Sequence, residues 1–215
     1  MSILDRYSAA IFDLDGTLAD SMQVWDTICR DWAAGRGYVP PEDLDRTIAL
    51  MTLDQSAEYV VRLFGLSETP GQVQQEWSRM VTRRYKESVR PKEGARELLE
   101  ALQKKGVPMA LATSGFPEAC MGFLESNSMD GFFSAVVYTQ DTGKDKTHPD
   151  VYLACARALD VPPEQCVVLE DLPESLPGVR RAGMGFVAVY DSSCKDWDAL
   201  AAQADQAVRS FKELL

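Results

Sequence analysis

Hydrophobic positions change their spacing near residue 89 of this chain. Before that point, from about residue 20, apolar side chains recur every three or four positions, which is the spacing of one buried helical face. After it, short apolar runs alternate with further helical patterns. Short, continuous apolar runs are typical of strands that a parallel sheet buries on both faces. The pattern therefore predicts a helical segment followed by an alternating α/β segment.

The first segment predicts three helices, with a short strand before them. Their signals are polar residues at the start, an apolar stripe and, in two of them, a glycine at the end. The strand covers Ala9–Phe12, and the helices cover residues 20–35, 52–65 and 71–85. Asp20 or Ser21 is expected to cap the first helix, and Thr52 with Gln55 forms a capping-box signal for the second. We assign the aromatic residues of these helices to their core.

The second segment alternates helices and strands, as expected for a parallel α/β sheet. Helices are predicted over 95–105, 118–125 and 150–159, and strands over 107–112, 135–138, 166–169, 185–189 and 207–208. The earlier helices have no strand partners and interrupt this order just after the first strand. We therefore predict an α/β core domain of residues 1–16 and 89–215 with an inserted helical domain of residues 17–88. The linkers are placed at 17–20 and 89–94.

Two carboxylates follow the first strand directly. Asp13 and Asp15 come next after Phe12, and Gly16 with Thr17 continues the run. Residues two apart on an extended backbone project to the same side, so we expect the two carboxylates to point together. Gly16 permits a tight turn beside a ligand. Because buried carboxylates are costly without a cation, this run predicts a phosphoryl-transfer site with a divalent metal or a phosphate partner.

Polar groups also follow two later strands. Ligands of open α/β sheets bind at the carboxyl ends of the strands, so these groups are candidates for the same site. Thr113 and Ser114 combine hydroxyls with backbone amides at a helix start, which suits phosphate oxygens and also an ordinary helix cap. Glu170 and Asp171 follow a buried apolar run and are candidate metal ligands.

A lysine between these strands is the candidate cation. Lys146 lies shortly before Pro149, which is placed to start the helix that leads to the next strand. Lys144, two residues earlier, is the competing candidate. We interpret His148 as a loop or cap residue, because carboxylate chemistry needs no imidazole.

Composition excludes several classes of protein. The chain has 215 residues, 46% of them hydrophobic, and a formal net charge of −11. Nucleic-acid and anionic-membrane partners need a basic surface, so neither is expected. Five widely spaced cysteines and one histidine indicate neither a disulfide framework nor a multi-histidine metal site. With no export signal and no apolar run of about 18 residues, we expect a cytoplasmic monomer that spans no membrane.

These strand-end residues resemble the four motifs of the haloacid dehalogenase (HAD) superfamily of phosphatases and phosphomutases. The matching positions are Asp13-x-Asp15-Gly16-Thr17, Thr113, Lys146-x-x-Pro149-Asp150 and Glu170-Asp171. The resemblance covers essentially the whole chain and implies a Rossmann-like parallel-sheet core. The inserted helices resemble the first-type cap of β-phosphoglucomutase-like members.

The resemblance also implies a role for each motif residue. Asp13 is the expected nucleophile and Asp15 the expected general acid/base. The phosphate ligands implied are Thr113 and Lys146, and the position of Ser114 after the same strand makes it a further candidate. The implied cofactor is Mg²⁺, held by Asp13, the Asp15 carbonyl and Asp171, with Glu170 beside them.

The chain departs from the family pattern at several positions. Thr147 and Ser175 replace a usual proline and glycine, and neither change removes a chemical group. β-Phosphoglucomutase has a histidine and an arginine in its cap where this chain places Trp25 and Leu53, although Arg46 is an alternative cap cation. We therefore predict a phosphatase that hydrolyses a small phosphorylated metabolite through an aspartyl phosphate, with a phosphosugar mutase as the alternative.

Two further alternatives are less compatible with the motif residues. A dehalogenase needs no second acid at Asp15. A HAD-like protein kept only for binding would be indicated by a missing nucleophile or lysine, and this chain has both Asp13 and Lys146. Magnesium-dependent release of phosphate from an aryl phosphate separates these possibilities.

Overall fold

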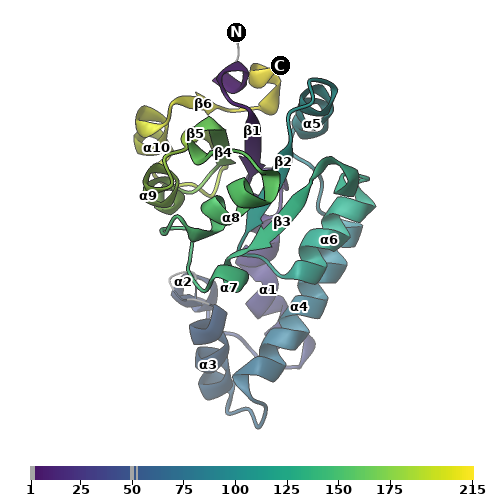
Figure 1. Ribbon diagram of the computed structural model, residues 1–215. Helices are drawn as coiled ribbons and strands as arrows, with labels where there is room; N and C mark the ends of the chain where they lie inside the picture. Colours follow the sequence, from purple (N-terminus) through teal and green to yellow (C-terminus); the bar gives the residue numbers. More distant parts are fainter. Residues whose placement is uncertain (1–2, 49–50, 52) are drawn as a thin grey trace.

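The computed structural model describes residues 3–48, 51 and 53–215, and its centre is one sheet of six parallel strands (Figure 1). In spatial order the strands are β3 (Ala135–Tyr138), β2 (Met109–Thr113), β1 (Ala9–Phe12), β4 (Cys166–Glu170), β5 (Gly185–Val189) and β6 (Gln206–Val208). β1 lies between β2 and β4, with Phe12 in register with Leu111 and Leu169. The carboxyl ends of these three strands are therefore adjacent at one edge of the sheet.

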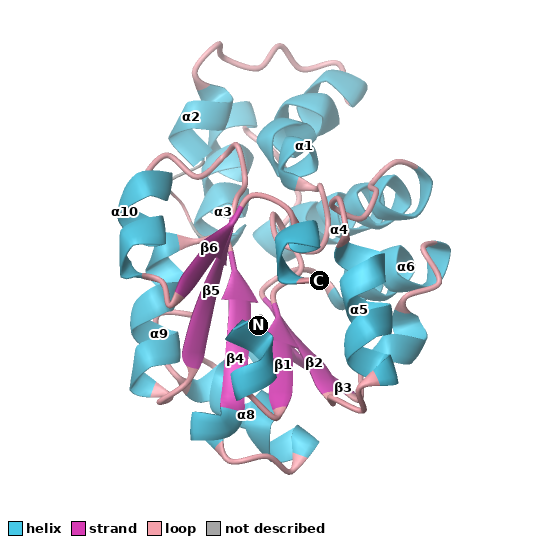
Figure 2. Ribbon diagram, turned by 90° about the horizontal axis from the view of Figure 1, so that it is seen from above, coloured by secondary structure: helices cyan, strands magenta, loops and turns pink. Residues whose placement is uncertain are grey.

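Helices cover both faces of the sheet (Figure 2). Ala10 and Phe12 of β1 join one hydrophobic cluster, together with residues of α5 (Ala95–Lys104) and α6 (Pro117–Ser126). Ala9 and Ile11 join a second cluster, with residues of α8 (Asp150–Leu159), α9 (Leu176–Arg181) and α10 (Trp197–Gln203). A short helix, α7 (Thr139–Thr142), follows β3. Burial of both strand faces explains why β1 reads as a continuous apolar run.

Among the described residues, four helices lie between β1 and α5 in the chain, and we call them the inserted helices. They are α1 (Met22–Gly35), α2 (Leu44–Ile48), α3 (Leu53–Phe64) and α4 (Pro70–Glu87). The Trp32 and Trp77 rings meet edge to face in their core, with centroids 6.0 Å apart. α4 also packs along α6, where a Cβ on Gly122 would lie 2.7 Å from Lys86 Cε (Figure 1). The inserted helices therefore share a long contact with the sheet-flanking layer.

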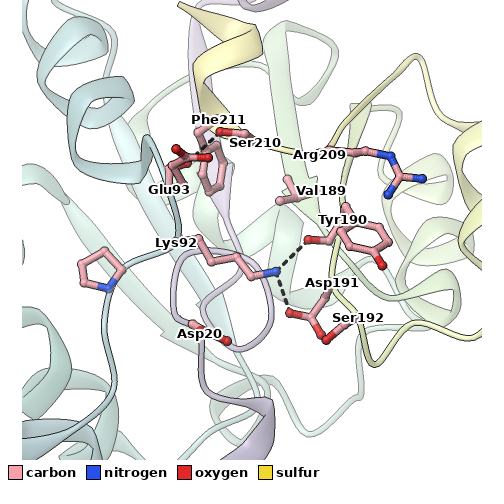
Figure 3. A pocket seen from close by; sticks show the side chains of 11 residues that line it. Asp20, Lys92, Glu93, Val189, Tyr190, Asp191, Ser192, Arg209, Ser210 and Phe211 are labelled. Carbon is pink, nitrogen blue, oxygen red and sulfur yellow. Dashed lines mark hydrogen bonds and ion pairs between the residues drawn. The ribbon is translucent and has the colours of Figure 1, made fainter.

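Two linkers join the inserted helices to the rest of the molecule, and they pair with each other. Asp20 N donates to Arg90 O at 3.0 Å, and Lys92 N donates to Leu18 O at 2.8 Å. The Lys92 side chain extends to the loop after β5, where Nζ donates to Tyr190 O at 2.7 Å (Figure 3). A cavity of about 300 Å³ lies beside this contact, between the linkers and the carboxyl ends of β5 and β6.

The elements predicted from the hydrophobic pattern are largely confirmed. β3, β5 and α8 have the predicted residues, and the helical segment lies where the spacing predicts it. α4 begins one residue earlier than predicted, at Pro70. Thr69, directly before it, forms a complete capping box with Gln72. The predicted cap at Thr52 lies outside the described residues. The pattern does not predict α2, α7, α9 and α10, since each is too short for an apolar stripe to repeat. Within the described ranges, no helix is both long and apolar enough to cross a bilayer.

Candidate active site

Three charged side chains from separate segments meet at the carboxyl ends of β1 and β4. Asp13 follows β1, Glu170 ends β4, and Lys146 comes from the loop before α8. Lys146 Nζ contacts Asp13 Oδ1 and donates to Glu170 Oε1 at 2.8 Å. The other oxygen of Glu170 accepts the backbone N–H groups of Asp171 and Leu172 at 2.9 and 3.0 Å. Glu170 thus uses both oxygens to hold the lysine and the loop after β4.

Two carboxylate oxygens beside this group are unpartnered. In the described part of the chain, Asp13 Oδ2 and Asp171 Oδ2 are buried without a hydrogen-bond partner. Asp171 Oδ1 accepts from Thr17 Oγ1 at 2.7 Å, which orients the carboxylate. Gly16 makes room for it at φ +82°, because a Cβ there would lie 2.3 Å from Asp171 Oδ2. Oxygens of Asp13, Glu170 and Asp171 lie within 4.8 Å of one another, and hard oxygen ligands suit Mg²⁺.

The buried charges of this cluster do not balance. Three carboxylates face one ammonium group, that of Lys146, so full ionisation leaves two negative charges in excess. Burial raises the pKa of Asp13 to about 7, Glu170 and Asp15 add to the increase, and Lys146 opposes it. Burial and the neighbouring carboxylates also raise the pKa of Asp171 to about 9. A bound divalent cation would neutralise the excess charge.

The lysine of this cluster keeps its proton despite its burial. Burial by itself would lower the pKa of Lys146, but the charges of Asp13 and Glu170 raise it well above its ordinary value. Lys146 is therefore a fixed positive charge in the site.

Thr113 is the last residue of β2, directly before the turn that faces Asp15. It is buried, and its Oγ1 accepts the N–H of Gly115 at 3.0 Å. A Cβ on Gly115 would lie 3.0 Å from Asp15 Oδ2 and 3.3 Å from Thr113 Oγ1. Ser114 is exposed. Of the two candidate hydroxyls, the structure therefore buries only that of Thr113.

The loop that carries Lys146 packs closely against α9. Gly178 allows this approach, because a Cβ there would lie 2.1 Å from the carbonyl oxygen of Lys146. The role of this residue is not predictable from the hydrophobic pattern, because α9 is too short to be recognised there. Lys144 is exposed, so the structure places Lys146 and not its competitor in the cluster. His148 is also exposed and contacts Asp145 Oδ1 at 3.1 Å, as a loop residue does.

Asp15 has a different set of partners from Asp13. Its Oδ1 accepts from Ser21 Oγ at 2.7 Å, from the Tyr85 hydroxyl and, at 3.4 Å, from the Trp25 indole N–H. Trp25 Nε1 also donates to the Tyr85 hydroxyl oxygen at 2.8 Å. Burial raises the pKa of Tyr85 well above its usual value, and the charge of Asp15 adds to the increase. Tyr85 therefore stays protonated and acts as a hydrogen-bond donor.

These contacts correct three expectations from the sequence. β1 ends at Phe12, so strand alternation does not reach Asp13 and Asp15, and the two carboxylates bind different partners. Ser21 gives α1 no side-chain cap, because its hydroxyl donates to Asp15. The core assignment of Tyr85 is correct for its ring, which is 1% exposed, but misses the hydroxyl. Periodicity identifies the buried face of a helix and not the polar atom that a buried side chain meets.

The inserted helices also contact the turn after β2. Trp25 stacks on Phe116 there, with ring centroids 5.8 Å apart. Leu53, the other position compared with the mutase cap, is 38% exposed at the start of α3. The side chain of Arg46, the alternative cap cation, lies outside the described residues. Trp25 is thus a cap position that the structure brings to the site.

Known proteins with similar sequences and structures share this architecture. The chain is 26% identical over 207 residues to a phosphorylated carbohydrates phosphatase of Thermotoga maritima, and the alignment covers 96% of each chain. It is 30% identical over 220 residues to hexitol phosphatase B of Escherichia coli, covering 100% of this chain and 97% of that one. The crystal structure of CbbY from Rhodobacter sphaeroides in complex with phosphate aligns with a TM-score of 0.81, over 97% of this chain and 96% of that chain. At 20% identity this last likeness supports the fold alone.

The family itself follows from a match over most of the chain. Residues 10–189 fit the family model of haloacid dehalogenase-like hydrolases. The resemblance found from the strand-end motifs is thereby confirmed, and so is the predicted parallel α/β fold. This chain belongs to the haloacid dehalogenase-like hydrolase family.

Proposed function

We propose that this protein is a Mg²⁺-dependent phosphatase that hydrolyses a small phosphorylated metabolite through an aspartyl phosphate. The observation that carries the proposal is the unbalanced cluster around Asp13 and Asp171. Each of these residues buries a carboxylate oxygen that has no partner among the described residues, beside the single charge of Lys146. Such an arrangement is costly in a purely structural ion pair and is typical of active sites. The phosphatase names of the related proteins support the same reaction.

We assign the metal and the phosphate to different atoms of the site. We assign Mg²⁺ to Asp13 Oδ2, Asp171 Oδ2 and the Asp15 backbone carbonyl. Glu170 is assigned to orienting Lys146, since both of its oxygens already accept hydrogen bonds. Bound there, Mg²⁺ would reduce the repulsion between the Asp13 carboxylate and a phosphate group. Thr113, Ser114 and Lys146 are the proposed ligands of the phosphate oxygens.

The proposed reaction consists of two phosphoryl transfers. In the first, a carboxylate oxygen of Asp13 attacks phosphorus, the bond from phosphorus to the substrate oxygen breaks, and Asp15 gives its proton to that oxygen. In the second, Asp15 takes a proton from water, the water oxygen attacks the same phosphorus, and the bond to Asp13 breaks to release inorganic phosphate. Lys146 stabilises the negative charge of the transferring group in both steps.

Phosphorylated carbohydrates are the substrate class that we propose first. The reason is that the two curated relatives are named for phosphorylated carbohydrates and hexitols. In this proposal the inserted domain, residues 17–88, acts as a cap on a core of residues 1–16 and 89–215 and excludes bulk water when it closes. A cytoplasmic monomer fits the same proposal, because hydrolysis of a small metabolite needs no second subunit.

Water is the proposed phosphoryl acceptor, rather than a second sugar hydroxyl. A mutase must protect the aspartyl phosphate from water until a sugar arrives, which requires cap groups that respond to the substrate. Trp25 instead donates to Tyr85 and Asp15, and Leu53 has no polar group. Incubation with β-glucose 1-phosphate and Mg²⁺ tests this point: efficient formation of glucose 6-phosphate with little free phosphate would overturn the choice of water.

Phosphate release from a substrate panel tests the proposed function as a whole. The panel consists of phosphorylated sugars and hexitols, nucleotides and p-nitrophenyl phosphate, each measured with Mg²⁺ and with EDTA. We expect Mg²⁺-dependent release from at least one carbohydrate phosphate, and none from the Asp13→Asn variant prepared in parallel. Release that persists in EDTA, or in Asp13→Asn, contradicts the proposed metal or nucleophile.

A further inference from the structure

Three hydrogen-bond donors converge on one oxygen of Asp15, and they come from another part of the fold. Ser21 lies directly before α1, Trp25 lies in α1, and Tyr85 lies in the last turn of α4. Asp15 itself belongs to the turn that follows β1. Tyr85 is 60 and 70 residues from its two partners in sequence, so only tertiary packing brings these groups together.

The direction of these hydrogen bonds is fixed by the chemistry of the donors. An indole N–H donates and does not accept. Trp25 Nε1 lies 2.8 Å from the Tyr85 hydroxyl oxygen, so that oxygen is the acceptor in their contact. The one hydroxyl hydrogen of Tyr85 is then left for Asp15 Oδ1. Trp25 therefore holds Tyr85, and Tyr85 holds Asp15.

This arrangement distinguishes the two oxygens of Asp15. Oδ1 receives the donors from Ser21, Trp25 and Tyr85. Oδ2 instead faces the turn after β2, since a Cβ on Gly115 would lie 3.0 Å from it. That turn directly follows Thr113, a proposed phosphate ligand, so Oδ2 is the oxygen on the side of the reacting group.

We propose that Tyr85, supported by Trp25, is a positioning residue that fixes Asp15 so that Oδ2 exchanges the proton with the substrate oxygen. The inference rests on the proposed phosphatase function and adds that proton transfer depends on side chains of the inserted helices. Trp25 also stacks on Phe116 in the turn after β2. The side chain that holds Tyr85 thus also docks α1 against the turn that binds phosphate.

The need for a proton from Asp15 depends on the leaving group of the substrate. A strongly basic alkoxide needs a proton as its bond to phosphorus breaks, whereas p-nitrophenolate is a weak base and leaves without much help. Loss of Asp15 positioning should therefore slow alkyl phosphates far more than p-nitrophenyl phosphate. The effect belongs in kcat/KM, which contains the steps up to departure of the leaving group.

Tyr85→Phe is the direct test, because it removes the hydroxyl and keeps the buried ring. Its kcat/KM is measured with p-nitrophenyl phosphate, phenyl phosphate and glycerol 2-phosphate, together with its melting temperature. We expect a loss of about 100-fold with glycerol 2-phosphate and of about threefold or less with p-nitrophenyl phosphate, with phenyl phosphate between them. Trp25→Phe should show the same order of losses in kcat/KM among the three substrates. Each loss should be smaller than in Tyr85→Phe, since the indole of Trp25 acts mainly through Tyr85.

A control variant and the wild type distinguish failure of the positioning role from failure of the proposed phosphatase function. Tyr59→Phe removes a hydroxyl from α3, another inserted helix, and should leave all three rates within about twofold of the wild type. Equal losses of Tyr85→Phe on all three substrates, or no loss, contradict the positioning role while the phosphatase function stands. A folded wild type without Mg²⁺-dependent activity on any panel member contradicts the proposed function itself, and the positioning role falls with it.

Discussion

Two largely buried lysine side chains each reach carboxylates at the carboxyl edge of the sheet, but in different surroundings. Lys92 pairs with Asp191 Oδ2 at 2.6 Å and donates to Tyr190 O at 2.7 Å (Figure 3). The second oxygen of Asp191 accepts both the N–H and the hydroxyl of Ser193, at 2.9 and 2.7 Å. One ammonium group thus faces one carboxylate, and both carboxylate oxygens have partners.

The Lys146 site has the opposite balance. Its single ammonium group faces three carboxylates, and among the residues that the structure describes two of their oxygens have no partner. Lys92 and Asp191 satisfy each other and fasten a linker to the core, which is the behaviour of a structural ion pair. The difference teaches that burial of a lysine and a carboxylate does not by itself indicate catalysis in this fold. What indicates catalysis is an excess of buried negative charge over the positive charge of the lysine.

Asp13, the proposed nucleophile, gives the strongest test of this distinction. Asp13→Asn keeps the shape of the side chain but cannot form an acyl phosphate, so we expect turnover to fall by about 10⁴-fold or more. Phosphate release with Mg²⁺ measures the loss, and circular dichroism with thermal melting checks the fold. A purified, folded variant that keeps substantial activity shows that Asp13 is not the nucleophile.

Replacement of Lys146 should have the next largest effect on turnover. Lys146→Ala removes the charge beside the transferring group, and we expect kcat/KM to fall by about 10²- to 10³-fold. Lys144→Ala is the matched control two residues away, with an exposed side chain and an expected change of less than about twofold. A larger loss in Lys144→Ala than in Lys146→Ala reverses our assignment of the cation.

Substitution of Lys92, which pairs with Asp191, should lower the stability of the fold and leave the catalytic rate nearly unchanged. Lys92→Met leaves the buried carboxylate of Asp191 without its cation, which should lower the free energy of unfolding by about 3–5 kcal/mol. We expect kcat to stay within about threefold, and the double variant Lys92→Met/Asp191→Asn to recover part of the lost stability. Urea unfolding measures the energies. A loss of kcat as large as that of Lys146→Ala, in a folded protein, would give Lys92 a catalytic role instead.

Metal binding should produce the smallest of these effects, an increase in the stability of the fold that depends on pH. The pKa values of Asp13 and Asp171 are raised in the fold from 3.8 to about 7 and about 9. Between about pH 4 and about pH 9, these two residues therefore hold more protons in the metal-free fold than in the unfolded chain, and their contribution to stability decreases as pH rises through this range.

Mg²⁺ should offset that decrease, because it replaces the protons on these carboxylates. At one fixed Mg²⁺ concentration, about tenfold above the dissociation constant at pH 8.5, we expect the melting temperature to rise by about 3–5 °C at pH 8.5 and by less at pH 5.5. Asp171→Asn should abolish most of the shift at pH 8.5. An equal shift at both pH values is the result that contradicts binding at these carboxylates.

The sequence by itself determines the order of the main elements and most of the chemistry. The short apolar runs predict β1, β4 and β5 closely, because these strands are buried on both faces of the sheet, which leaves little room for polar residues. The same runs locate Asp13, Thr113, Glu170 and Asp171, since each motif begins where a strand ends. Pro149 and the following helix distinguish Lys146 from Lys144 for the same local reason.

The tertiary structure alone decides which atoms of these residues meet. Asp13 and Asp15 are two residues apart, yet Asp13 binds Lys146 while Asp15 binds Tyr85, seventy residues away in sequence. Gly178 is needed only because another segment, the loop of Lys146, passes within van der Waals distance of its helix. Hydrophobic spacing records which side of an element is buried, and the hydrogen bonds between distant segments form only when the elements pack.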